Sequence, residues 1–421
     1  MSNSTCNTMQ KDIMDVNNEL PMAGNMTFHD IILITELACV IATFALSLYQ
    51  IACHALNYRR PVEQKYILRI LFMVPLYSVS MLLSTKFFPY STYFILLSST
   101  YASVAIASYF SLLCHYLAPD GDSKSLFSNI QPGPWQNYFP LPLRWLHDRF
   151  GGEKSFLRAM TCGVTWFNII TLGILQYCLL RCLTAIASVI AQPLGRYCAS
   201  SLNPLYCHIW TLALNAISAT IAMYCLDQFT WQMKDALRAH RPTLKLWCVK
   251  IVFAVSMYQN LILALITTAW IPSKSAVQAT SKVAYADLRV GIPALMLCFE
   301  LLFTSILHIH AFSWRVYGAE VQRKASYGGF LGYLAILDAL NIFDLIRAFG
   351  SALRWLLKKE GGYETTDQTD NLGDSKINLL NDEKASFSLS TVAVEREVGF
   401  LEPITYLDPV HTGPEPFRDL E

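Results

Sequence analysis

Residues 172–183 read LGILQYCLLRCL, and this almost wholly apolar stretch decides the class of fold. Apolar residues continue on both sides, so that residues 161–191 contain one charged residue, Arg181. An apolar run of about 18 residues or more is long enough to cross the hydrocarbon of a bilayer. The stretch therefore predicts a membrane-spanning helix, and it raises the question of what a guanidinium does inside one.

Composition also indicates a membrane protein. Hydrophobic residues make up 53% of the chain and charged residues 15%, against roughly 25% charged residues in ordinary soluble proteins, and the mean hydropathy is +0.34. We predict an all-α, polytopic membrane protein with seven transmembrane helices. The expected spans are residues 31–55, 67–84, 93–117, 161–191, 205–226, 244–270 and 290–312.

The distribution of positive charge predicts the orientation. The loops after the first, third and fifth spans, and the segment after the seventh, are rich in Lys and Arg, whereas the alternate loops are poorer. Because cytosolic loops carry the positive excess, we expect a luminal or extracellular N-terminus and a cytosolic C-terminus. The chain has two N-glycosylation sequons, at Asn3 and Asn25, and both lie on the predicted luminal side, where glycosylation is possible.

We divide the chain into a luminal N-terminus (1–28), a transmembrane domain (29–320), a cytosolic amphipathic helix (330–359) and a C-terminal tail (360–421). The tail holds 14 of the 31 acidic and 4 of the 32 basic residues, a net charge of −10, which leaves +11 on the rest. Its acidic, Ser/Thr/Asn/Gly-rich composition predicts disorder. Residues 335–356 show one apolar stripe at steps of four and three, typical of a helix on the cytosolic leaflet or against the base of the bundle.

Ionisable residues inside the predicted spans are the main functional candidates, because charge is costly in a bilayer and usually faces protein or a water-filled cavity. Glu36 is expected near the luminal headgroups and Lys250 within reach of the cytosolic interface. Glu300 lies about ten residues from either end of its span, so its short side chain reaches neither the luminal headgroups nor the cytosolic interface. Two interpretations stay open. In the first, Glu300 forms a structural ion pair with Arg181 or Lys250. In the second, a positively charged side chain lines a cavity and binds an anionic, amphipathic solute.

Neutral polar residues extend this candidate solute pathway. Gln176 and Gln259 supply hydrogen-bonding amides, and Tyr177 an amphipathic ring. Signals for an enzyme are absent from the sequence, which has no phosphate-binding glycine loop, no HExxH-type metal spacing and nothing that indicates a cofactor or a nucleic-acid partner. Cys198 and Cys207 flank one short loop and form a disulfide if that loop is luminal and their geometry allows it.

Several segments, in order and spacing, resemble one family. They are FMVPLYSVS with Pro75 and Tyr77, the stretch 101–117, LGILQYCLLR, MYCLDQF at 223–229, and RPTLKLWCVKIVFAVSMYQN. Together they make the chain similar to the organic solute transporter alpha / transmembrane protein 184 family over roughly residues 31–320. Two positions depart from the family pattern. Ala102 follows Tyr101 where the family commonly has an acid, and Tyr258 stands before Gln259 where Trp is frequent.

The resemblance implies seven spans with a luminal or outer N-terminus. It also implies facilitated movement of steroid-like or other amphipathic organic anions, with a small single-span partner subunit in some animal members. For fungal and plant members it implies a vacuolar or endomembrane location rather than the plasma membrane. The substrate, the coupling ion and the oligomeric state stay open.

A different class of function, that of a membrane scaffold, remains as an alternative. Phe343-Asp344-Leu345-Ile346 fits the aromatic-x-x-aliphatic pattern that ubiquitin-like autophagy proteins read, with Phe343 and Ile346 as the contacting residues. Burial of Phe343 against the membrane is the structural interpretation of the same residues. A seven-span receptor is a third hypothesis, disfavoured because the third span ends LLCHYL, without a DRY-like motif.

Overall fold

The computed structural model describes residues 19–22, 24–119, 123–128, 130, 132–133, 163–198, 203–240, 242–267, 280–284, 286–318 and 325–360. These residues fold into helices joined by short connections. The long helices are α2 (Phe28–Leu56), α3 (Pro61–Lys86), α4 (Ser91–Leu117), α7 (Gly163–Ala191), α8 (Cys207–Gln232), α9 (Pro242–Thr267), α10 (Ile292–Ala311) and α12 (Phe343–Glu360). The shorter ones are η1 (Phe88–Tyr90), α5 (Ser123–Ser128), η2 (Arg238–His240), η3 (Asp287–Gly291), η4 (Trp314–Tyr317), η5 (Phe330–Gly332) and α11 (Tyr333–Leu340).

Each of the seven predicted spans coincides with one long helix, and the ends differ by a few residues. Among the described residues, six segments are long and apolar enough to cross a membrane, and they contain α2, α3, α4, α7, α8 and α10. The protein is therefore a polytopic helical membrane protein. The seventh predicted crossing corresponds to α9, a helix of 26 residues, and it stays a prediction.

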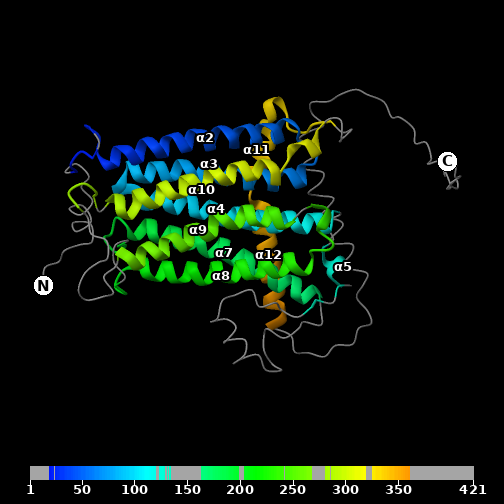
Figure 1. The fold of residues 1–421 in the computed structure, drawn as a ribbon. Helices are drawn as coiled ribbons and strands as arrows, with labels where there is room; N and C mark the ends of the chain where they lie inside the picture. Colours follow the sequence, from blue (N-terminus) through cyan, green and yellow to red (C-terminus); the bar gives the residue numbers. More distant parts are fainter. Residues whose placement is uncertain are drawn as a thin grey trace, which may run out of the picture. The chain divides into compact units, whose positions relative to one another are not determined.

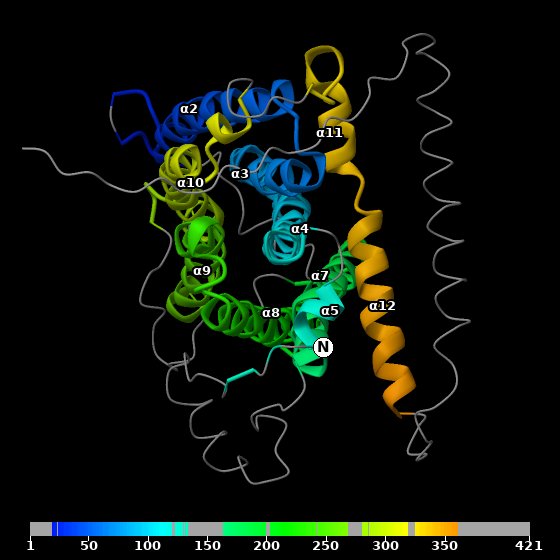
Figure 2. The same ribbon diagram turned by 90° about the vertical axis from the view of Figure 1, so that its right-hand side faces the viewer.

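Helices α2, α3, α4, α7, α8, α9 and α10 lie side by side, and successive helices run in opposite directions (Figure 1). Seen along their axes, α3 lies among α2, α4 and α10, while α7 connects α4 to α8 and α9 lies next to α10 (Figure 2). Helix α3 is accordingly the most buried of the six candidate crossings, with 72% of its apolar window inside the protein. The buried centre of the bundle is the place where a polar side chain would meet protein instead of lipid.

Local sequence sets where helices begin and end. Thr27 and Asp30 form a reciprocal capping box at the start of α2, which satisfies amide groups that have no partner inside the helix. Pro61 stands at the first position of α3, where a missing N–H costs nothing. At the other end of α10, the side chains of Gln50 and His54 contact the free carbonyl of Phe312 at 2.9 and 2.8 Å.

The C-terminal helices α11 and α12 cross the bundle helices instead of running along them (Figure 1). The prediction of one continuous amphipathic helix is wrong in this respect, because the chain leaves the helical conformation at Asn341, where φ is −77° and ψ is 100°. Helix α11 packs against α3 and α12 against α7 (Figure 2). The buried face of α12 includes Leu345 and Ala352, whereas Ile346 and Leu353 of the predicted stripe are exposed.

Glycines allow α11 to approach the end of α2 closely. A Cβ atom on Gly332 would lie 2.6 Å from the Cβ atom of Ala55, and Gly332 has a φ of +77°, a conformation that side chains disfavour. A Cβ on Gly328 would lie 2.3 Å from the Ala55 carbonyl oxygen. The turn that leads into α11 therefore requires glycine at both positions.

The disulfide between Cys198 and Cys207 does not form. Cys207 has a free thiol, whereas Cys198 is disulfide-bonded. Cys198 lies within the α7–α8 connection, and Cys207 begins α8, with its amide bonded to the Arg196 carbonyl at 2.9 Å. Of the predicted glycosylation sites, Asn25 is exposed. Asn3 lies outside the described residues, as does the acidic tail beyond Glu360.

Candidate functional site

Arg181 occupies the second half of α7 and reaches across to α4. Its guanidinium donates a hydrogen bond to the Ser99 hydroxyl. Its Nε is buried and has no hydrogen-bond partner among the described residues. None of the ion pairs in the described part of the chain includes it. Within the described part of the chain, the five donors of the guanidinium thus have one partner, the Ser99 hydroxyl.

Glu300 lies midway along α10, and both of its carboxylate oxygens are buried without a hydrogen-bond partner in the described residues. The predicted ion pair of Glu300 with Arg181 or Lys250 is therefore wrong. Lys250 pairs instead with Asp227. The reason is geometric, since α8 ends and α9 begins at the same end of the bundle, which places Asp227 beside Lys250.

Tyr77 of α3 lies near both of these groups. Its side chain is almost fully buried and interacts with the Ser256 side chain of α9, and the charges of Arg181 and Glu300 both act on it. We call Tyr77, Ser99, Arg181, Ser256 and Glu300 the central polar cluster. Five helices contribute to it, namely α3, α4, α7, α9 and α10.

The remaining candidates from the sequence have structural partners. The Gln176 amide donates to the Ser218 carbonyl at 3.0 Å, and the Ser218 hydroxyl donates back to the Gln176 oxygen at 2.8 Å. Tyr177 packs edge-on against Phe253, with the ring centroids 5.7 Å apart. The Gln259 amide donates to the Pro293 carbonyl at 2.6 Å. These residues tie α7 to α8, α7 to α9, and α9 to α10.

The central polar cluster can bind an anion by simple chemistry. A guanidinium offers a planar fork of N–H donors that matches a carboxylate, sulfate or phosphate. Among the described residues Arg181 donates to the Ser99 hydroxyl alone, whereas the hydroxyls of Ser99 and Ser256 donate to carbonyls of their own helices. Glu300 places an opposite charge or, when protonated, a further donor within range of the same tyrosine. The arrangement suits a negatively charged head group of a solute whose remainder is apolar.

Sequence reasoning undervalued Ser99 and missed Ser256. A small residue recurs every four positions on α4, at Ser99, Ser103, Ala107 and Ser111. Such a face predicts close helix packing, and nothing in that pattern marks one serine as a partner of Arg181. Glu36 is fully buried and accepts a hydrogen bond from the Thr85 hydroxyl at 3.0 Å, so its side chain faces protein. The expectation that it lies near the luminal headgroups stays a prediction.

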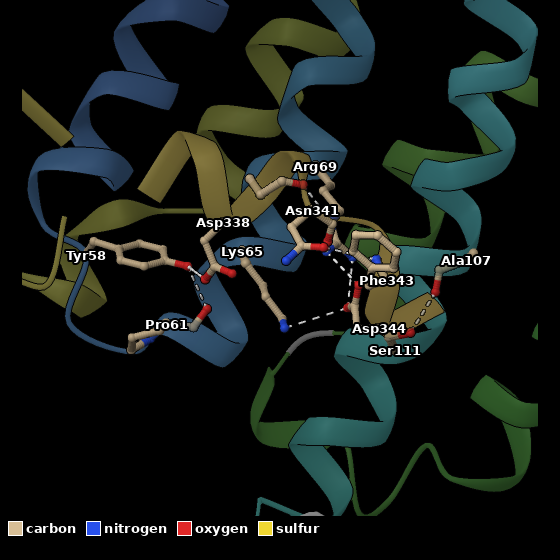
Figure 3. Close-up of polar contacts among 11 residues, drawn as sticks. Tyr58, Pro61, Lys65, Arg69, Ala107, Ser111, Asp338, Asn341, Phe343 and Asp344 are labelled. Carbon is tan, nitrogen blue, oxygen red and sulfur yellow. Dashed lines mark hydrogen bonds and ion pairs between the residues drawn. The ribbon is translucent and has the colours of Figure 1, made fainter. Parts of the chain in front are cut away.

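Arg69 was also missed, because an arginine three residues inside a predicted span resembles one that reaches for the interface. It is 1% exposed and holds the C-terminal helices (Figure 3). Its guanidinium donates to the carbonyls of Ala339 at 2.7 Å and Asn341 at 2.5 Å, and to both carboxylate oxygens of Asp344 at 2.8 and 3.0 Å. We call these contacts the Arg69–Asp344 anchor.

The anchor determines how the predicted partner-binding residues are presented. Phe343 is 71% exposed and Ile346 57% exposed, whereas Leu345 between them is buried. Asp344 lies in the first turn of α12, and its carboxylate is engaged by Arg69 and, at 3.7 Å, by Lys65. Phe343 and Ile346 therefore lie on the outer side of a helix that is fixed to α3.

Comparison with known proteins decides the family. The family model described as "Organic solute transporter Ostalpha" matches residues 32–317, which is more than half of the chain. The chain belongs to this family. The Ostalpha match confirms the resemblance seen in the sequence, and it indicates membrane solute transport, in a family of transporters and not of enzymes. No solved structure matches the chain.

The Ostalpha match runs from the first turns of α2 to the end of η4. It therefore includes every member of the central polar cluster, as well as Arg69. It leaves out α11 and α12, whose Asp344 completes the anchor. The part of this Ostalpha protein that corresponds to the family model is thus the helix bundle that holds the cluster.

Proposed function

We propose that this protein carries amphipathic organic anions across its membrane, and that Arg181 contacts the anionic group of the solute. One observation carries the proposal. Arg181 lies within the bundle with one hydroxyl partner and no carboxylate partner among the described residues. A guanidinium in such a place is costly, and an anionic ligand is the partner that would offset this cost.

In this proposal Glu300 and Tyr77 affect how strongly the solute binds, and they do not neutralise the charge of Arg181. Tyr77 lies near both charged groups, and its hydroxyl can donate to the solute. The apolar part of the solute would pass along helices whose surfaces carry aliphatic and aromatic side chains. Lys250, engaged by Asp227, then has a supporting role at one end of the bundle.

The proposed orientation puts the N-terminus in the lumen or outside and the C-terminus in the cytosol, with α9 as the seventh crossing. The disulfide of Cys198 supports it, because disulfides persist in oxidising compartments and this residue follows α7 at the end of the bundle where α2 begins. The proposal places the protein in a vacuolar or other endomembrane. A small single-span subunit is the proposed partner.

The experiment is flux into liposomes that contain the purified protein. A labelled anionic steroid conjugate is tested with wild type, Arg181→Ala and Arg181→Lys. We expect protein-dependent flux that Arg181→Ala lowers by about tenfold or more, the effect of roughly 1.4 kcal/mol, and that Arg181→Lys partly restores because the charge is retained. The matched control is Arg347→Ala, which removes an exposed arginine of α12.

Equal flux by wild type and by folded Arg181→Ala would overturn the role of Arg181. Absence of flux from folded wild type, alone and with a co-purified small subunit, would overturn transport of this substrate class. Folding is checked separately by gel filtration and by protection of the helices from protease.

A scaffold function is the second candidate, and the exposure of Phe343 and Ile346 on one side of α12 favours it. The partner expected from the aromatic-x-x-aliphatic pattern of these residues is a ubiquitin-like autophagy protein. The test is recovery of that partner by wild type and by a Phe343→Ala, Ile346→Ala variant. Ala substitution of Leu337, an exposed leucine of α11, serves as the control. Equal recovery by all three proteins would remove this candidate.

A further inference from the structure

The outer face of α12 carries one apolar stripe. Phe343, Ile346 and Leu353 are 71%, 57% and 37% exposed. Together with the half-buried Gly350 they follow one another at steps of three, four and three residues, which places all four on one side of the helix. We call them the outer stripe of α12. The exposed arginines of α12 lie beside this stripe and not in it, so the stripe is an apolar surface that calls for an apolar partner.

The opposite face attaches α12 to the sides of two bundle helices. Leu345 is buried together with Ala107 of α4 and Leu175 of α7, and Ala348 and Phe349 pack against this group. Figure 2 shows α12 along the outside of α7, across the direction of the bundle axes. The depth of α12 in the membrane therefore follows from the positions of Ala107 and Leu175 along their own helices.

Both of these positions lie within the hydrocarbon of the bilayer. The hydrocarbon core is about 30 Å thick, which about 20 residues of a helix span at about 1.5 Å per residue. Wherever that segment is placed along the 29 residues of α7, it contains residues 172–182 and therefore Leu175. The same argument for the 27 residues of α4 gives residues 98–110, which include Ala107. The beginning of α12 thus contacts the bundle at the level of the hydrocarbon.

The ion pair of Arg69 supports this depth independently. Along the 26 residues of α3, residues 67–80 lie in the hydrocarbon for every placement, and Arg69 is among them. A guanidinium there is costly, and its carboxylate partner is Asp344, in the first turn of α12, at 2.8 Å. Lys65, which lies 3.7 Å from the same carboxylate, is outside that range. The beginning of α12 is therefore just inside the boundary between hydrocarbon and headgroups.

We infer that α12 is embedded in the membrane parallel to its plane, and that its outer stripe contacts the acyl chains of the leaflet on the side where α3 begins. In the proposed orientation this is the cytosolic leaflet. Acyl chains fit the stripe because it is apolar, free of charge and at hydrocarbon depth. The exposed arginines beside it are long enough to bring their charges to the lipid headgroups. The inference does not depend on transport, and it makes Phe343 and Ile346 inaccessible to a soluble partner.

The experiment identifies what the outer stripe touches. The full protein is placed in lipid nanodiscs of phosphatidylcholine and phosphatidylserine, with Phe343, Ile346 or Leu353 replaced one at a time by the photoreactive residue benzoylphenylalanine. After irradiation, mass spectrometry detects covalent adducts. We expect phospholipid adducts at all three positions, several-fold more abundant than at the control position Asp235, an exposed residue between α8 and α9.

A second measurement uses charge instead of crosslinking. An aspartate is disfavoured in hydrocarbon, so Ile346→Asp should drive α12 out of the bilayer for part of the time. We expect protease cleavage of α12 in the nanodiscs to become about tenfold faster or more, the effect of roughly 1.4 kcal/mol. Ser351→Asp, at an exposed position of α12 outside the stripe, is the matched control and should change the cleavage little. If Ile346→Asp fails to fold, the crosslinking still decides, because benzoylphenylalanine keeps the position apolar.

Several results would overturn the inference. The first is lipid adducts at the outer stripe that are no more abundant than at Asp235. The second is a crosslinked dimer in place of lipid adducts, which would assign the stripe to a second copy of the chain. The third is an adduct with an added ubiquitin-like autophagy protein, which would favour the scaffold function. The fourth is equal cleavage of folded Ile346→Asp and Ser351→Asp. None of these measurements involves anion flux, so their failure and the failure of the proposed function are distinguishable.

Discussion

Arg69 and Arg181 are two guanidinium groups inside helices long and apolar enough to cross a membrane, and their surroundings differ. Arg69 donates to two backbone carbonyls and to both oxygens of Asp344, all supplied by the C-terminal helices (Figure 3). Arg181 donates to the hydroxyl of Ser99 and has no carboxylate partner among the described residues.

The difference teaches how to assign a role to a buried charge. A guanidinium whose donors are matched by protein acceptors contributes to one fixed arrangement, and removing it leaves those acceptors buried and unpaired. A guanidinium whose donors are mostly uncommitted is open to a ligand, and its removal affects binding more than folding. Arg69 fits the first description and Arg181 the second.

The largest effect on stability is expected from Arg69→Met. It leaves the Asp344 carboxylate and two carbonyls without their donor, and breaking a buried ion pair in this way costs about 3–5 kcal/mol. Unfolding in detergent by a denaturant series measures the change. Lys65→Met is the matched control, since Lys65 contacts the same carboxylate at 3.7 Å from a less buried position and should cost about 1 kcal/mol or less.

A double variant sharpens this result. Replacing both partners, Arg69→Met with Asp344→Leu, removes the uncompensated charge and should recover most of the lost stability. If the single and double variants were equally unstable, the anchor would act through its contacts to the carbonyls rather than through the ion pair.

The second-largest effect is a pH dependence of the stability of the C-terminal helices α11 and α12. Burial alone would raise the pKa of Asp344, but the hydrogen bonds and charge of Arg69, with the charge of Lys65, outweigh it and hold the pKa below its ordinary value of 3.8. Because the folded-state pKa is depressed, the stabilisation is present above pH 3.8 and is lost as the pH falls below it. Protease cleavage of α11 and α12 against pH should rise there, and Asp344→Asn should flatten the profile.

A smaller effect is expected from Tyr58→Phe. The Tyr58 hydroxyl lies 2.6 Å from Oδ2 of Asp338 in α11 and 3.0 Å from the Pro61 carbonyl. Loss of one such hydrogen bond costs about 1 kcal/mol, which is less than any disruption of Arg69. The denaturant series used for Arg69→Met detects it. A cost as large as that of Arg69→Met would mean that the anchor is not centred on the guanidinium.

The smallest effect on stability is expected from Arg181→Met. Among the described residues one hydrogen bond of the guanidinium, to Ser99, is lost. The buried guanidinium itself is also removed, so the free energy of unfolding should change by about 1 kcal/mol or less. The same unfolding measurement checks it beside the flux assay. A loss as large as that of Arg69→Met would contradict the comparison and assign Arg181 a structural role.

The spans could be predicted from the sequence because a long apolar run has few other stable places. The helix around residues 172–183, for example, follows from its length and from the lack of a second charge. The break at Asn341 could not be predicted, because the apolar spacing continues across it, and what ends α11 there is the backbone conformation of one residue.

Pairings across the chain were the hardest to predict. Asp287 lies 258 residues from His29, its partner, and no spacing rule connects them. The sequence showed which side chains are costly in a membrane, as with Glu300 and Arg181, but it could not show which would find partners. Lys250 and Asp227 illustrate this limit, since their pairing depends on where neighbouring helices begin and end.

The Arg69–Asp344 anchor has a consequence for the making of the protein. Its two ends are 275 residues apart, so at about 5–20 residues per second the ribosome needs roughly 15–55 s to synthesise the second after the first. During this interval Arg69 is already in the nascent bundle without its counter-ion. Among the described helices α12 is the last to emerge, so a chain that ends before Asp344 keeps a buried arginine that no carboxylate neutralises.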